Sequence, residues 1–137
     1  MPYRFRDHTA DLALVIEAPT LAGLFEEACR AFAAVLVADV TAIGASETRV
    51  LTIPGCDPAE RLVDLLAELL HAYESERLLL PHGTVEVRPD GLRVVARGEH
   101  LDEARHETTH EVKAVTYHGL TVRRVEGGFV AEVVLDV

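Results

Sequence analysis

Apolar residues recur at helical spacing in two segments of the chain. One stripe, at intervals of three and four residues, runs from residue 21 to residue 36, and Thr20 is placed to cap its start. A second stripe runs through residues 62–73. Its start signal is clearer, because Asp57 precedes Pro58 at the first helical position. The pattern therefore predicts two amphipathic helices.

Alternation of apolar and polar residues, which is typical of strands, covers most of the remaining chain. It predicts strands over residues 3–6, 12–17, 46–53, 84–88, 92–97, 111–117, 120–125 and 129–135. His118-Gly119 is predicted to be a turn between two of these strands. Two helices followed by a run of strands predict an α+β fold. We expect a two-layer sandwich in which two helices pack on a largely antiparallel β-sheet.

The length of 137 residues fits one domain over residues 1–137. No apolar run approaches the roughly 20 residues of a membrane span, and the first residues are too polar for a signal peptide. We therefore expect a cytoplasmic protein with no membrane partner. Cys29 falls in a helical pattern and Cys56 follows a Pro-Gly turn. They form no CxxC pair, which favours one packed and one loop thiol over a zinc or redox site.

The charge balance is strongly acidic, with a net charge of −10. This counts against direct nucleic-acid binding, because a duplex is itself a dense array of negative phosphates. Such a protein can act on RNA only indirectly, through a basic partner, and its carboxylates can collect cations. Among the 13 basic residues, Lys113 is the only lysine. Arg and Lys differ chemically, so either a compact amine is needed there or Lys113 is an ordinary solvated residue.

Judged by residue type alone, two carboxylates are the strongest candidates for a functional site. Asp11 closes a polar turn before a predicted strand, and Asp136 ends the last strand, followed by the main-chain oxygen of Val137. Oxygen donors alone suit hard cations such as Ca²⁺ or Mg²⁺. Spacing alone predicts no contact between residues 125 positions apart. Two solvated acids therefore remain the alternative.

Other chemistry finds little support in the sequence. No phosphate-binding glycine loop and no GxSxG or SxxK nucleophile pattern is present. His100, His106 and His110 cluster in sequence but form no HExxH pair. The pattern favours surface or turn histidines over zinc ligands.

Three stretches resemble the archease family. These are His8-Thr9-Ala10-Asp11 near the start, Glu111-Val112 followed by Lys113-Ala114-Val115-Thr116-Tyr117-His118-Gly119-Leu120, and Leu135-Asp136-Val137. The resemblance runs in order from Tyr3 to Val137. It departs in the second helix, where the family commonly has bulkier or amide residues at the positions of Leu65 and Ala67.

The resemblance implies a function in RNA ligation. Archeases are non-catalytic activators of an RtcB-type RNA ligase in tRNA splicing and RNA repair, and they promote ligase guanylylation and multiple turnover. The resemblance further implies that Asp11, Asp136 and the main-chain carbonyl of Val137 bind a divalent metal. That metal is usually described as calcium, with Mg²⁺ or Mn²⁺ as alternatives. Lys113 would work beside it on a ligase-activating surface that also includes His118, Glu111 and His8.

Other functions stay open on the sequence alone. The chain could be a stand-alone metal-dependent phosphoesterase, or a chaperone-like modulator of partner proteins. A metal at Asp11 and Asp136 could be purely structural, since bound ions stabilise folds without taking part in reactions. The sequence also leaves homo-oligomer formation undecided.

Overall fold

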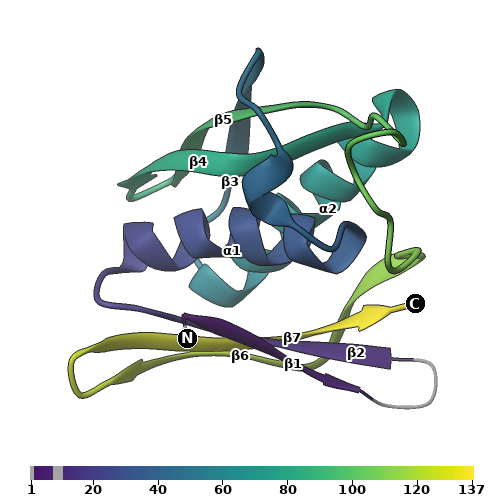
Figure 1. The fold of residues 1–137 in the computed structure, drawn as a ribbon. Coiled ribbons are helices and arrows are strands. Elements are labelled where there is room, and N and C mark those ends of the chain that lie inside the picture. Colours follow the sequence, from purple (N-terminus) through teal and green to yellow (C-terminus); the bar gives the residue numbers. More distant parts are fainter. Residues whose placement is uncertain (1, 8–10) are drawn as a thin grey trace.

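Figure 1 shows the computed structural model, which describes residues 2–7 and 11–137. The elements are β1 (Tyr3–Asp7), β2 (Asp11–Ala18), α1 (Leu21–Leu36), the 3₁₀ turn η1 (Val40–Ala42), β3 (Glu47–Pro54), α2 (Pro58–Glu76), β4 (Leu78–Arg88), β5 (Gly91–His100), β6 (Ala114–Val125) and β7 (Gly128–Asp136). The α+β class with two helices and antiparallel strands is confirmed. Within the described residues, neither helix is long and apolar enough to cross a membrane.

The strands form two sheets, which adds a layer to the expected sandwich. One sheet has the order β1-β2-β7-β6 and the other the order β3-β5-β4, and all neighbours are antiparallel. Both helices lie between the sheets (Figure 1). The sequence pattern identified the strands but not their partners, because pairing joins segments far apart in the chain.

The composition of α1 explains why two sheets are needed. Its buried residues are Leu24, Phe25, Glu27, Ala28, Cys29, Ala31, Phe32, Ala33, Val35 and Leu36, and they surround most of the helix. A helix with a single buried stripe can lie on one sheet, whereas a helix that is apolar nearly all round must be covered on several sides. The second sheet supplies that cover.

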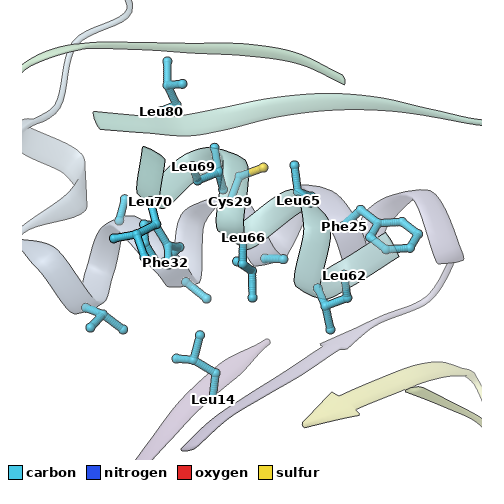
Figure 2. Close-up of a cluster of buried hydrophobic side chains, with 14 of the residues drawn as sticks. Leu14, Phe25, Cys29, Phe32, Leu62, Leu65, Leu66, Leu69, Leu70 and Leu80 are labelled. Carbon is cyan, nitrogen blue, oxygen red and sulfur yellow. The ribbon is translucent and has the colours of Figure 1, made fainter. Parts of the chain in front are cut away.

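The core joins the three layers. Figure 2 shows Leu14 of β2 below the helices and Leu80 of β4 above them, with Phe32 of α1 and Leu66 of α2 between. Leu14 and Leu66 are fully buried, and each such side chain contributes roughly 1.5–3 kcal/mol to folding. The core also holds the Cys29 thiol, whose pKa is raised to about 12 by burial and by the nearby Glu26 carboxylate. It is therefore a packing group and not a nucleophile.

Both helices begin as their sequences predict. The Thr20 hydroxyl accepts a hydrogen bond from the Gly23 N–H at 3.0 Å, which caps α1. At α2 the Asp57 carboxylate accepts from the Ala59 N–H at 3.2 Å, and Pro58 occupies the first turn. Each cap satisfies one of the N–H groups that the first helical turn leaves without a partner.

The predicted turn at His118-Gly119 is wrong. β6 runs without interruption from Ala114 to Val125, and both of its halves pair with β7. The register passes from Thr116 opposite Val134 to Thr121 opposite Glu132, so this stretch of β6 is a bulge with three more residues than β7 has opposite it. Gly119 has φ +68°, a conformation that serves a bulge as well as a hairpin turn. The glycine signal was therefore correct, but it marks a bend within one strand.

A buried arginine connects α2 to two turns. Arg61 is only 3% exposed, and among the described residues its guanidinium is bonded to main-chain carbonyls and to no carboxylate. Its Nε donates to the Gly55 carbonyl at 2.8 Å, and its Nη2 donates to the carbonyls of Arg88 and Pro89 at 3.0 and 3.1 Å. The guanidinium thus satisfies carbonyl groups of the β3–α2 and β4–β5 connections at once.

Glu99 anchors the segment between β5 and β6. Its carboxylate accepts hydrogen bonds from the Gly44 N–H at 2.5 Å and from the Arg105 guanidinium at 2.6 and 3.2 Å. His106 is buried and lies 3.0 Å from the same carboxylate through Nε2. The Asp102 N–H donates to Nδ1 of His106 at 2.9 Å, so Nε2 carries the hydrogen that points at Glu99.

The same segment then closes the C-terminal end of α1. The Thr109 N–H donates to the Leu36 carbonyl at 3.0 Å, and the Thr109 hydroxyl donates to the Val35 carbonyl at 2.7 Å. Nδ1 of His110 lies 3.1 Å from that same Val35 oxygen. Carbonyl groups that the last helical turn cannot satisfy are satisfied here, and the chain is directed toward Lys113.

We predict that Arg61→Met lowers the free energy of unfolding by about 2–4 kcal/mol, because it removes the three hydrogen bonds that the buried guanidinium donates. The measurement is urea denaturation at neutral pH. The control is Arg93→Met, which removes an exposed arginine of β5 and should change stability by no more than about 0.5 kcal/mol. If Arg61→Met and Arg93→Met lowered the free energy of unfolding by the same amount, the structural role of Arg61 would be contradicted.

A second prediction concerns pH. The Arg105 guanidinium and the Gly44 N–H lower the pKa of Glu99 to about 2, from its ordinary value of 4.5. Because the folded-state pKa is the lower one, the stabilisation by Glu99 is complete above about pH 4.5 and disappears as the pH falls toward about 2. The difference in unfolding free energy between wild type and Glu99→Gln should shrink over that range.

The matched control is Glu86→Gln. Glu86 accepts from Arg88 on the surface of the same sheet, and its side chain is 56% exposed. This variant should stay within about 0.5 kcal/mol of wild type at each pH. If the difference in unfolding free energy between wild type and Glu99→Gln stayed constant from pH 6 to about pH 3, the proposed titration of Glu99 would be ruled out.

Candidate functional site

The sheet brings Asp11 and Asp136 directly opposite each other. Asp11 begins β2, Asp136 ends β7, and the antiparallel register pairs the two residues. Residues paired in this way project from the same face of a sheet, with Cβ atoms roughly 4.5–5.5 Å apart. Two residues that lie 125 positions apart in sequence are therefore brought together by the pairing of β2 with β7.

The pair projects from the outer face of its sheet. Leu12 and Leu135, the next residues in register, are 1% and 0% exposed and lie in the core beneath the helices. Since successive strand residues alternate between faces, Asp11 and Asp136 point away from the helices. Both residues are half-buried. The two carboxylates thus lie at one corner of the molecule, where a partner can reach them.

Lys113 joins this corner from the segment before β6. Its N–H donates to the main-chain carbonyl of Asp136 at 2.7 Å, and the next residue, Ala114, pairs with Asp136 in the sheet. The prediction that residues 111–113 are part of the strand is wrong, because β6 begins at Ala114. Lys113 is exposed. The only lysine of the chain is therefore bonded through its main chain to the residue that carries one of the two carboxylates.

The donors at this corner fit a hard divalent cation incompletely. Asp11, Asp136 and the carbonyl of Val137 would supply oxygen ligands only, which suits Ca²⁺, Mg²⁺ or Mn²⁺. Ca²⁺ takes about six to eight oxygens, more than these three residues offer, so water or a partner must complete the shell. Within residues 2–7 and 11–137, no group of three or more His, Cys, Asp or Glu side chains could hold a metal by itself.

Of the other residues predicted for the ligase-activating surface, the structure describes Glu111 and His118. His8 lies outside the described residues. Glu111 is exposed and lines a cleft of about 550 Å³ with Tyr73 and Arg77, at the end of α2. His118 lies in the bulge of β6, where its N–H donates to the Thr116 hydroxyl at 3.3 Å. Among the described residues, no hydrogen bond or ion pair joins Glu111 or His118 to the carboxylate pair.

The histidines outside this surface have structural contacts. His106 was expected to be a surface or turn residue, but its side chain is fully buried against Glu99. His110 contacts the end of α1. The expected cysteine environments are confirmed, because Cys29 is buried and Cys56 is exposed.

The sequence pattern did not single out Thr116 or Tyr117. The Thr116 hydroxyl donates to the Val134 carbonyl at 3.0 Å and accepts from His118 in the bulge. Tyr117 follows it and is 63% exposed. A lone threonine and a lone tyrosine in an alternating strand carry no local signal, because only the shifted register distinguishes them.

Comparison with known proteins gives a consistent result over nearly the whole chain. Residues 3–137 match the model of the Archease protein family. The protein archease of Methanopyrus kandleri is 38% identical over 140 residues, with 99% of each chain covered. The protein archease of Methanosarcina mazei is 31% identical, covering 98% of this chain and 95% of the relative.

Solved structures agree. The solution structure of Methanobacterium thermoautotrophicum protein 1598 superposes with a TM-score of 0.79 at 32% identity, covering 99% of both chains. The crystal structure of an archease from Thermotoga maritima, described as a possible chaperone, gives a TM-score of 0.68. At 22% identity over 96% of this chain and 94% of its own, that structure supports the fold alone. On the family match and the identity of its relatives, the chain belongs to the archease family.

Proposed function

We propose that this chain is a non-catalytic activator of an RtcB-type RNA ligase and acts in the cytoplasm in tRNA splicing and RNA repair. It would promote guanylylation and repeated turnover of the ligase through a divalent cation, most simply Ca²⁺, together with Lys113. The proposal depends on one observation, the register of β2 and β7, which places Asp11 opposite Asp136. The N–H of Lys113 donates to the carbonyl of Asp136 beside this pair.

The incomplete donor set supports a cation that is shared with a partner. When bound, a divalent cation supplies positive charge and open coordination positions for phosphate oxygens. Asp11 and Asp136 would hold it from the outer face of the sheet, and Val137 would contribute its main-chain oxygen. The remaining positions suit the phosphates of a nucleotide in the ligase, which are strong oxygen donors.

Charge at this corner supports the same role. Without a cation, the carboxylates of Asp11 and Asp136 outweigh the ammonium of Lys113, and a triphosphate is repelled. Asp11 and Asp136 would be offset by a bound divalent cation, and the ammonium of Lys113 would then leave this corner with a net positive charge. Positioned positive charges stabilise the charge that develops during phosphoryl and nucleotidyl transfer. The chain itself would need no nucleophile, in keeping with a non-catalytic function.

The overall charge fits a protein partner. A net charge of −10 favours approach to the basic surface of an RNA-binding enzyme and disfavours RNA itself. The chain would therefore meet RNA only through the ligase. A chaperone-like action, the description attached to the Thermotoga maritima relative, is the competing proposal, and it needs neither the cation nor Lys113.

We predict that Asp136→Asn weakens cation binding roughly 10–100-fold and lowers guanylylation of the cognate ligase by about tenfold or more, because one charged ligand is lost. Calorimetric titration with Ca²⁺ and a guanylylation assay are the two measurements. The control is Asp90→Asn in the exposed β4–β5 turn, which should change neither. If Asp136→Asn loses the cation but keeps full activation, the cation is purely structural.

The role of Lys113 is tested by Lys113→Arg, which keeps the charge but replaces the compact ammonium by a planar guanidinium. We expect cation affinity to stay within about twofold and maximal guanylylation to fall about tenfold. The control is an arginine–lysine exchange at an exposed site of β6, Arg123→Lys. Full activation by Lys113→Arg would show that any positive charge suffices and that the single lysine has no special function.

A further inference from the structure

The bulge of β6 displaces a short piece of chain from the sheet. Between Thr116 and Thr121 the strand takes five residue steps, whereas β7 takes two between Val134 and Glu132, so three residues of β6 are extra. β6 is an edge strand of the four-stranded sheet, so no further strand of the described chain pairs with the extra residues on that side. We call residues 117–119 the β6 knuckle.

The knuckle is held from both ends. Val115 before it and Leu120 after it pack against the hydrophobic core. The Thr116 hydroxyl donates to the Val134 carbonyl at 3.0 Å and accepts from the His118 N–H at 3.3 Å. Gly119 has φ +68°, the left-handed conformation that lets the chain return to the strand. A segment fixed in this way loses little conformational freedom when a partner binds it.

The knuckle presents Tyr117 to solvent. Its 63% exposure is the largest among the exposed large hydrophobic side chains of the described residues. Tyrosine is enriched among residues that dominate interface affinity, because it buries a large rigid ring and keeps a polar tip. Tyr117 lies three residues after Ala114, the partner of Asp136, which is about 10 Å along the strand. Tyr117 is therefore close along the strand to the candidate cation corner.

The net charge of the chain selects the partner. A net charge of −10 disfavours the phosphates of nucleic acid and favours a protein surface with basic side chains. An exposed tyrosine ring on such a chain is suited to an apolar pocket with a basic rim.

We propose that Tyr117 on the β6 knuckle is the anchor by which the chain docks on its protein partner, inserting into an apolar pocket bordered by arginine or lysine side chains. The identification of that partner as an RNA ligase rests on the proposed function above. Docking at Tyr117 then brings the cation corner, about 10 Å away, to the nucleotide site of the ligase. In this arrangement the ring supplies affinity, and the cation and Lys113 supply activation.

The test measures binding and activation separately, with the full chain and the cognate ligase. Tyr117→Ala should weaken binding, measured by calorimetry or interferometry, by roughly thirtyfold, whereas Tyr117→Phe should stay within about threefold. The matched control is Val50→Ala, which shortens a 55%-exposed side chain on the other sheet and should leave affinity unchanged. Because Tyr117 is exposed, the thermal midpoint of Tyr117→Ala should equal that of wild type.

The dependence of ligase guanylylation on the concentration of this chain distinguishes a residue that docks on the ligase from one that promotes the reaction. Tyr117→Ala should raise the concentration needed for half-maximal guanylylation by the same factor and leave the maximum unchanged, whereas Asp136→Asn should lower the maximum. Undiminished ligase affinity in Tyr117→Ala, or no wild-type binding to the ligase, overturns the docking proposal. So does Tyr117-dependent binding of a single-stranded RNA oligonucleotide in place of the ligase. Tyr117-dependent binding without any activation supports docking and overturns only the proposed function.

Discussion

The antiparallel register of β2 and β7 is the constraint on which the rest of the structure depends. It joins the first long strand of the chain to its last, and it places Leu12, Leu14 and Ile16 beside Leu135, Val133 and Ala131 beneath the helices. A shift by one residue would turn these side chains toward solvent, so the core itself enforces the register. The same register sets Asp11 opposite Asp136. The energy that fixes the candidate site is thus hydrophobic and comes from its neighbours.

What could be predicted from the sequence follows from how local each signal is. Thr20 and Asp57 act on N–H groups two or three residues away, so both helix starts were predictable. The division into two sheets depends on pairings between distant segments, and it could not be read from alternation. Gly119 marked a left-handed backbone position, but its local pattern does not distinguish a hairpin turn from a bulge, because only the pairing with the partner strand decides.

Polar residues were harder to predict for the same reason. Arg61 lies among polar positions of a helix, yet its three acceptors come from two connections elsewhere in the chain. His106 is buried because Glu99 and the Asp102 N–H satisfy both of its ring nitrogens. The carboxylate pair had support from residue type and family resemblance only, until the sheet placed Asp11 and Asp136 in register. Burial of a polar group is set by tertiary partners, which no local pattern contains.

The proposed cation site at Asp11 and Asp136, which the chain alone cannot complete, would have a thermodynamic consequence. If phosphate oxygens in the ligase complete the coordination shell, the cation binds more tightly in the complex than in the free chain. By linkage, the free chain must then bind the ligase more tightly when the cation is present, by the same factor. A closed, fully coordinated site would gain nothing from the partner and would show no such coupling. The openness of the corner at Asp11 and Asp136 is therefore what would make a bound ion a link between the two proteins.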